Sequence, residues 1–248
     1  MDDISLLHGD CLELLPTISD KVDLVLCDLP YAKTKCKWDT LIPFDLLWAQ
    51  YERLVGSPTI VLFGVEPFSS MLRLSNQKNY RYDWIWRKSH AANFIASKKM
   101  PLIKHENISV FYTKNKTYNP QMVPGEPHFN RSGEELYERS KDSIGGKAPD
   151  ILQNILVNER FPSSVLEFNG DPMCKRVHPT QKPVALLEYL LRTYTNEGDT
   201  ILDNCMGSGS TGVACVNTRR KFIGIEKEES YFDIAMNRIA EAVVNTGK

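Results

Sequence analysis

The sequence predicts an α/β fold in which helices cover both faces of a twisted, mostly parallel β-sheet. Short apolar runs indicate buried strands at residues 22–27 and 59–63, and the segment 44–54 between them carries apolar residues at helical spacing. The same alternation returns near the carboxyl terminus, with a predicted strand at 200–203 followed by a helix at 211–217. Strands that alternate with helices are typical of parallel sheets with both faces covered, so we expect a Rossmann-like arrangement.

The middle of the chain interrupts this pattern. After two strands predicted at 82–86 and 108–112, residues 113–176 become polar and contain six prolines and a Gly-Gly pair. A connection of that length is uncommon in a compact domain unless it has a function of its own. We therefore expect residues 1–112 and 177–248 to form two halves of one α/β domain, with residues 113–176 as an insert.

Composition and charge narrow the classes of function. No run approaches the ~18 apolar residues that a membrane span needs, and the amino terminus lacks the basic start and apolar stretch of a signal peptide. We therefore expect a soluble, cytoplasmic protein without a membrane partner. Six cysteines form no CxxC pair and no zinc-like spacing with the five histidines, so we predict neither a disulfide framework nor a metal site.

The distribution of charge points to the middle of the chain. The net charge of −1 argues against a uniformly basic coat for nucleic acid. Residues 80–182, however, carry 16 Lys and Arg against 11 Asp and Glu. A phosphate-binding surface, if the protein has one, is therefore expected in this segment.

A glycine-rich turn follows the strand predicted at 200–203. The segment from Asp203 to Gly212 reads DNCMGSGSTG and leads into a helix, whose free N–H groups can face a polar or anionic ligand. Glu226 lies nineteen residues after Gly207, where a carboxylate can accept hydrogen bonds from both ribose hydroxyls of an adenosyl group. This spacing leaves both NAD and S-adenosylmethionine open as cofactors. The predicted cofactor-binding residues here are Asp203, Cys205, Gly207, Ser208, Gly209, Thr211, Gly212 and Glu226.

A second motif, Asp28-Leu29-Pro30-Tyr31, follows the strand that ends at Cys27. An exocyclic amine on a nucleobase is a poor nucleophile, because its lone pair is delocalised into the ring. Hydrogen bonds from its N–H groups to the Asp28 carboxylate and the Leu29 carbonyl would favour the pyramidal nitrogen that attacks a methyl group. Pro30 fixes the turn, and Tyr31 offers a flat face on which a base flipped out of a duplex can stack. We predict all four as catalytic residues.

These four residues resemble the (Asp/Asn/Ser)-Pro-Pro-Tyr signature of DNA amino-methyltransferases, with Leu29 in place of the usual proline. Asp in the first position is typical of adenine-N6 enzymes, and Ser is more usual in cytosine-N4 enzymes. The order of the motifs, with the glycine-rich turn in the carboxyl-terminal half, resembles the β-class of this family. The resemblance implies a Rossmann-like S-adenosylmethionine-dependent methyltransferase sheet with an inserted target-recognition region. It also implies S-adenosylmethionine as cofactor and adenine N6 in double-stranded DNA as substrate.

Weaker segments agree with the resemblance. Residues 8–15 (HGDCLELL) resemble the family's amino-terminal motif, in which Asp10 would lie near the cofactor's adenine. Residues 178–183 (HPTQKP) resemble the segment in which Lys182 would help to hold the methionine end. His105-Glu106 resembles part of the strand pair beside the target pocket. Without the resemblance, Asp10 could equally be a helix N-cap and Lys182 a solvated charge.

Several alternatives stay open at this point. Cytosine-N4 methylation would use the same machinery, and related tetrapeptides occur in RNA and protein-glutamine methyltransferases. A NAD-dependent oxidoreductase fits the glycine spacing, and Leu29 allows a catalytically inactive relative. A homodimer and a cognate restriction nuclease are candidate partners. The DNA recognition sequence does not follow from residues 113–176, because base readout depends on geometry.

Overall fold

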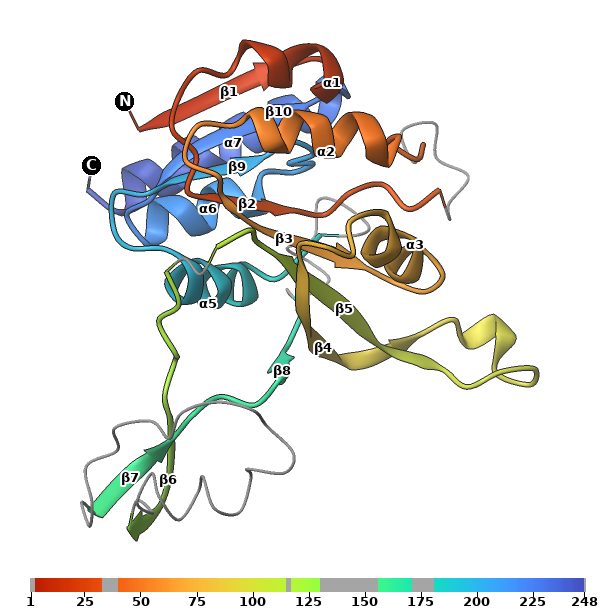
Figure 1. Cartoon of the computed structure of the whole chain (residues 1–248), viewed down its shortest axis with the longest axis vertical. Coiled ribbons are helices and arrows are strands. Elements are labelled where there is room, and N and C mark those ends of the chain that lie inside the picture. Colours follow the sequence, from red (N-terminus) through yellow and green to blue (C-terminus); the bar gives the residue numbers. More distant parts are fainter. Residues whose placement is uncertain (1–2, 33–39, 115–116, 130–155, 171–180, 248) are drawn as a thin grey trace. The chain divides into compact units, whose positions relative to one another are not determined.

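The computed structural model describes residues 3–32, 40–114, 117–129, 156–170 and 181–247 (Figure 1). The chain divides into two compact units, of which one comprises residues 1–119 and 164–248 and the other residues 120–163. Cys36, Cys174 and residues 178–180 of the HPTQKP segment lie outside the described residues.

The larger unit is built on an eight-stranded sheet with the order β1-β10-β9-β2-β3-β5-β4-β8. Its first five strands run parallel: β1 (Ile4–His8), β10 (Lys221–Glu226), β9 (Thr200–Asp203), β2 (Leu24–Cys27) and β3 (Thr59–Gly64). β5 (Ile103–Phe111) is antiparallel to β3 and to β4 (Tyr80–Ala92), and β8 (Val165–Phe168) pairs parallel with β4. The sheet is therefore mostly parallel, and the predicted fold class is confirmed.

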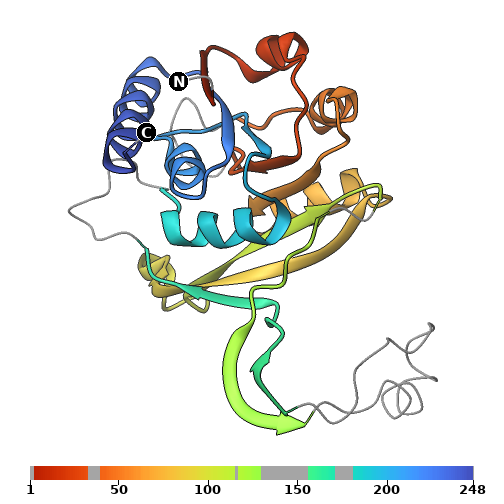
Figure 2. The same cartoon turned by 90° about the vertical axis from the view of Figure 1, so that its left-hand side faces the viewer.

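Helices cover both faces of this sheet (Figures 1 and 2). One face is covered by α1 (Cys11–Leu14), α2 (Phe44–Arg53) and α3 (Phe68–Ser75), and the other by α5 (Val184–Tyr194), α6 (Ser210–Asn217) and α7 (Glu229–Asn245). Successive strand residues point to opposite faces, so Leu24 and Leu26 pack with α5–α7 while Val25 and Cys27 pack with α1–α3. Among the described helices, none is both long and apolar enough to cross a membrane.

The described residues of the predicted insert 113–176 form three strands. β6 (Val123–Phe129) and β7 (Leu156–Arg160) form an antiparallel pair in the smaller unit. β8 belongs instead to the large sheet, where Leu166 joins the core. The sequence pattern did not indicate β8. The strand has only four residues, of which one is buried, and so short a segment shows no clear alternation of apolar and polar residues.

Candidate active site

Four carboxylates lie along one edge of the sheet, where neighbouring parallel strands end. Asp28 follows β2, Asp203 ends β9, Glu226 ends β10, and Asp10 follows β1 by two residues. Strands lie about 4.8 Å apart, so the row spans about 14 Å. Ligands of open α/β sheets bind at the carboxyl ends of the strands, which makes this edge the candidate site.

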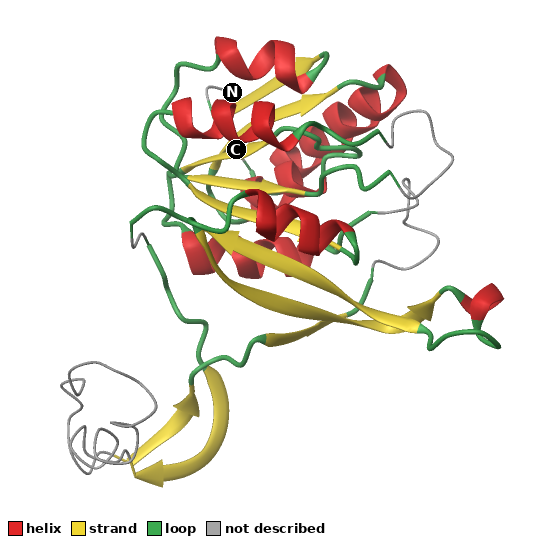
Figure 3. Ribbon diagram, turned by 45° about the vertical axis from the view of Figure 1, so that its right-hand side comes forward, coloured by secondary structure: helices red, strands yellow, loops and turns green. Residues whose placement is uncertain are grey.

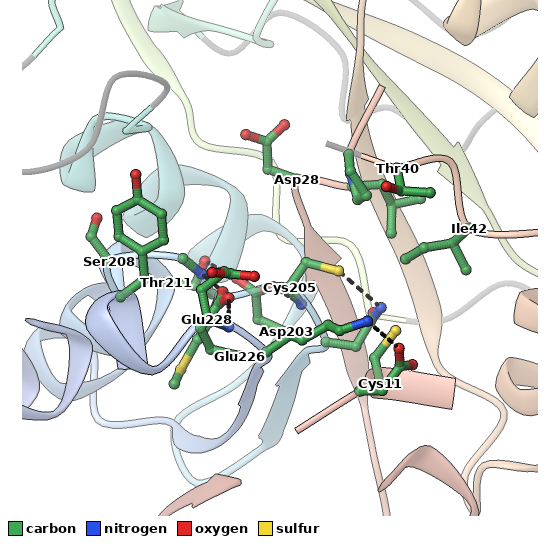
Figure 4. Close-up of a pocket in the computed structure, with 18 of the residues that line it drawn as sticks. Cys11, Asp28, Thr40, Ile42, Asp203, Cys205, Ser208, Thr211, Glu226 and Glu228 are labelled. Carbon is green, nitrogen blue, oxygen red and sulfur yellow. Dashed lines mark hydrogen bonds and ion pairs between the residues drawn. The ribbon is translucent and has the colours of Figure 1, made fainter. Parts of the chain in front are cut away.

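These side chains line one cavity of about 380 Å³ (Figure 4). The twelve predicted residues that line it are Asp10, Asp28, Leu29, Pro30, Tyr31, Lys182, Asp203, Cys205, Gly207, Ser208, Thr211 and Glu226. The sequence did not indicate the lining residues 40–43 and Tyr231, which carry no recognisable motif. The described lining side chains include five carboxylates and two ammonium groups. This excess of negative hydrogen-bond acceptors favours a cationic ligand with hydroxyl groups.

Glu226 holds two turns at the wall of this cavity. Its Oε2 accepts a hydrogen bond from the backbone N–H of Gly207 at 2.8 Å, and its Oε1 accepts one from Glu228 at 2.8 Å. Burial raises the pKa of Glu226, and the backbone donors oppose that rise. Each carboxylate oxygen has a further lone pair, so Glu226 can also accept hydrogen bonds from ligand hydroxyls.

Asp203 is a buried carboxylate without a described cation beside it. Its Oδ1 accepts from the backbone N–H of Cys205 at 3.1 Å, and its Oδ2 accepts from the Thr211 hydroxyl at 2.6 Å. Burial raises the pKa of Asp203 to about 6, so the group is largely ionised at neutral pH. A buried charge without a partner is unfavourable, and a cationic ligand in the cavity would relieve it.

The glycines of the turn divide between two roles. Gly207 lines the cavity with φ of 52°, and no described atom lies within 4 Å of the position that a Cβ would take. Gly209 and Gly212 do not line it. A Cβ at Gly209 would lie 2.8 Å from the Cβ of Ala235, and one at Gly212 would lie 2.9 Å from Phe222. These two glycines let the turn and α6 pack closely on α7 and β10. The glycine spacing in the sequence does not show whether a glycine is required for such packing or for contact with a ligand.

Asp28 is held by two neighbouring side chains. The Tyr31 hydroxyl donates a hydrogen bond to its Oδ1, and the Lys182 ammonium pairs with its Oδ2. Burial raises the pKa of Asp28, and Lys182 opposes that rise. Burial alone would lower the pKa of Lys182, but Asp28 and Glu106 outweigh it and raise that pKa. With 7% of its side chain exposed, Lys182 is not a solvated charge, and its predicted contact with the cofactor stays a prediction.

Glu106 continues this chain of charges away from the cavity. Lys88 pairs with its Oε1, and its Oε2 lies 3.4 Å from the Nζ of Lys182 without forming a hydrogen bond. Burial would raise the pKa of Glu106, but Lys182 and Lys88 outweigh it and lower that pKa. Positive and negative groups therefore alternate from Asp28 through Lys182 and Glu106 to Lys88.

Asp10 combines the two roles that the sequence left open. Its Oδ1 caps α1 by accepting from the backbone N–H of Leu12 at 2.9 Å, and its Oδ2 lies 3.0 Å from the Nζ of Lys227. Hydrogen bonding from Lys227 holds the pKa of Asp10 below its usual value. The same carboxylate lines the cavity, so capping and a place at the ligand site coexist.

Leu29 and Tyr31 join the base motif to the core. The Leu29 side chain is 3% exposed and packs with the cluster that includes α2, which gives a physical reason for a large apolar residue here. The Tyr31 ring packs against Phe68, with centroids 4.8 Å apart at 41°. Packing on Phe68 and the hydrogen bond to Asp28 therefore fix the ring at the cavity wall.

Comparisons with known sequences agree with this geometry. The family described as DNA methylase, which comprises N6 and N4 methyltransferases, matches residues 22–237. The type II methyltransferase M.HpaI of Haemophilus parainfluenzae is 25% identical over 254 residues, covering 96% of this chain and 74% of the relative. M.HinfI of Haemophilus influenzae, also a type II methyltransferase, is 27% identical over 273 residues, covering 97% and 69%.

Solved structures show the same architecture. The M1.HpyAVI–SAM complex matches with a TM-score of 0.62 at 27% identity, covering 95% of this chain and 98% of that chain. The cytosine-N4-specific PvuII DNA methyltransferase matches in fold with a TM-score of 0.64 at 16% identity, covering 98% and 92%. The family match spans the base motif at Asp28, the glycine-rich turn from Asp203 to Gly212, and Glu226. The chain therefore belongs to the N6/N4 DNA methylase family.

Proposed function

We propose that this protein transfers a methyl group from S-adenosylmethionine to N6 of adenine in double-stranded DNA. One observation carries the proposal: the Asp28 motif and the turn held by Glu226 line the same cavity. One wall thus offers a carboxylate to an amine, and the other offers acceptors to a nucleoside. Family membership removes the NAD-dependent oxidoreductase that the glycine spacing left open.

The cavity suits S-adenosylmethionine, which combines a ribose with a sulfonium and an ammonium cation. Glu226 would accept hydrogen bonds from the ribose hydroxyls. Asp203, which has no described cation beside it, would favour the positive charge. The complex of M1.HpyAVI with SAM supports the same cofactor for this chain. When bound, S-adenosylmethionine supplies an electrophilic methyl group to the amine.

Asp28 and Lys182 would prepare the site for the target amine. In the structure both oxygens of Asp28 are occupied, one by Tyr31 and one by Lys182. An entering amine donates to Asp28 in place of the ammonium, which turns toward Glu106. The Oε2 of Glu106 is suited to receive it, because this oxygen is buried, lies 3.4 Å from Nζ and has no hydrogen bond from a described residue.

Adenine is proposed over cytosine because Asp occupies position 28. Cytosine N4 is the second candidate, since the PvuII enzyme of the same fold is cytosine-N4-specific.

We further propose residues 113–176, including the unit at 120–163, as the target-recognition insert between the halves 1–112 and 177–248. We also propose a cognate restriction nuclease as a partner, because the similar proteins M.HpaI and M.HinfI are type II methyltransferases. A homodimer is a second proposed partner state, and analytical ultracentrifugation would test it.

Substitution of Asp28 tests the proposed site. Asp28→Ala should retain binding of S-adenosylmethionine but lower the rate of methyl transfer to DNA by more than about 100-fold, as for loss of one preorganised catalytic hydrogen-bonding group. Asp45→Ala is the matched control, because Asp45 is an exposed carboxylate in the first turn of α2. Transfer by Asp28→Ala at the rate of the control would contradict the assigned role.

A further inference from the structure

The hairpin formed by β4 and β5 ends in an exposed apolar tip. We call residues 93–102 the hairpin tip; Figures 1 and 3 show it extending from the sheet. Phe94 is 77% exposed and Ile95 is fully exposed, and Met100 and Leu102 are also exposed. Several large apolar side chains gathered at one exposed site indicate an interaction surface rather than part of a core.

The hairpin tip has a defined backbone. Asn93 adopts the left-handed conformation with φ of 67°, and a 3₁₀ turn spans Phe94–Ala96. The N–H of Ala96 donates to the carbonyl of Asn93 at 3.0 Å, and the N–H of Lys99 donates to that of Ala96 at 2.8 Å. Phe94 and Ile95 are therefore presented on a hydrogen-bonded turn, which lowers the entropy lost when they are buried in a partner.

The charge around the hairpin tip fits a polyanion. No Asp or Glu occurs between Asp83 and Glu106, whereas that interval contains five Lys and Arg. Lys98, Lys99 and Lys104 are exposed, and no carboxylate among the described residues forms an ion pair with them. Exposed apolar side chains flanked by cations match proteins that insert a wedge between DNA base steps while cations contact the phosphates.

The other end of the same hairpin meets the active site. Trp86 of β4 pairs with Glu106 of β5, and Glu106 belongs to the charge chain that reaches Asp28. From Trp86 to Ala92 the strand extends by about 20 Å, at about 3.3 Å for each residue. That length corresponds to about six base-pair steps of DNA. A duplex whose base reaches Asp28 is therefore long enough to lie along the hairpin to its tip.

We propose that the hairpin tip binds the duplex substrate as a wedge. Phe94 and Ile95 contact base steps about six base pairs from the target base, and Lys98, Lys99 and Lys104 contact the phosphates. This inference rests on the proposed function, because the partner it names is the DNA that the active site methylates.

Two sets of substitutions separate the apolar and the charged contributions. Phe94→Ala with Ile95→Ala should weaken binding to a labelled unmethylated duplex by about 5–150-fold, as for loss of one base-stacking contact, with an unchanged salt dependence. Lys98→Ala, Lys99→Ala and Lys104→Ala together should reduce the slope of log K against log salt by about 3, because each phosphate contact contributes about 0.9.

The control removes equally exposed apolar side chains elsewhere. Leu74 on α3 and Val244 on α7 are 73% and 76% exposed, and Leu74→Ala with Val244→Ala should leave DNA binding unchanged. Melting temperature and S-adenosylmethionine binding should match the wild type in every variant, because the substituted side chains lie outside the core and do not line the cavity.

The outcomes distinguish this inference from the proposed function. Wild-type affinity and wild-type salt slope in both hairpin variants, with active wild-type enzyme, would overturn the wedge alone. The Phe94 and Ile95 substitutions could instead convert a dimer to a monomer that keeps its DNA affinity. That result would also overturn the wedge and would show that the hairpin tip binds a second copy of the chain. A wild-type protein that binds cofactor but neither binds nor methylates any DNA would overturn the proposed function itself.

Discussion

Replacement of Lys182 by Met tests the charge chain beside the cavity. Lys182 has 7% of its side chain exposed, pairs with Asp28, and lies 3.4 Å from Glu106, whose side chain is 9% exposed. Met keeps most of the volume but leaves the two carboxylates without the cation between them. Breaking a buried pair costs about 3–5 kcal/mol, so we expect a loss of unfolding free energy of this size near neutral pH.

The loss should depend on pH in a defined direction. Lys182 lowers the pKa of both Asp28 and Glu106, so its removal raises both values in the folded state. The folded variant then binds protons at higher pH than the folded wild type does, so its deficit in unfolding free energy relative to the wild type shrinks as pH falls. Lys182→Met should therefore be closest to the wild type near pH 5 and furthest from it near pH 8.

Urea unfolding at these two pH values measures the effect. Lys227→Met is the matched control, because Lys227 pairs with Asp10 at 3.0 Å but has 66% of its side chain exposed. An exposed pair contributes less than about 1 kcal/mol, so the control should change little. Lys182→Met combined with Glu106→Gln should recover part of the loss. Equal destabilisation at both pH values, or a loss no larger than that of the control, would refute the reasoning.

Three further outcomes follow from the structure. Gly209→Ala should cost about 2–5 kcal/mol of unfolding free energy, because this position combines a left-handed φ with the close approach of Ala235. The control Gly198→Ala, at φ of 85° with open space around the added Cβ, should cost only about 1–2 kcal/mol. Equal losses in denaturant titrations would show that the contact with Ala235 does not matter. Burial raises the pKa of Asp203 to about 6, so the wild type should lose about 2 kcal/mol relative to Asp203→Asn as pH rises from 4 to 7. A pH-independent difference in unfolding free energy would contradict this. In methyl-transfer kinetics, Tyr31→Ala should lower kcat/KM by about 5–150-fold while Tyr31→Phe keeps most of it, because the ring provides the stacking face; similar losses in both would assign the role to the hydroxyl.

The sequence predicted the strands and carboxylates of the site because their signals are local. Cys27 ends a run of apolar residues, so the next residue, Asp28, had to lie at a strand end. The same reasoning placed Asp203 at the end of the strand that became β9. Its spacing from Gly207 singled out Glu226, which ends β10. Once the strands are parallel neighbours, these carboxylates meet at one edge without further information.

Contacts between distant segments did not follow from the sequence. Lys182 lies 154 residues from Asp28, and no local pattern shows that its ammonium is buried between two carboxylates. Gly209 and Gly212 have the spacing of a ligand turn, but their need for a missing Cβ comes from α7 and β10. Likewise, the apolar tip at Phe94 and Ile95 could have belonged to a core until the hairpin placed both in solvent.

The most direct test of the central claim is the identity of the methylated base. Purified protein is incubated with S-adenosylmethionine and unmethylated duplex DNA of varied sequence, the DNA is digested, and the nucleosides are identified by mass spectrometry, with Asp28→Ala as the control. The account predicts N6-methyladenine from the wild type and none above background from the variant. N4-methylcytosine would reverse the proposed base, and no methylated base from protein that binds the cofactor would contradict the proposed function.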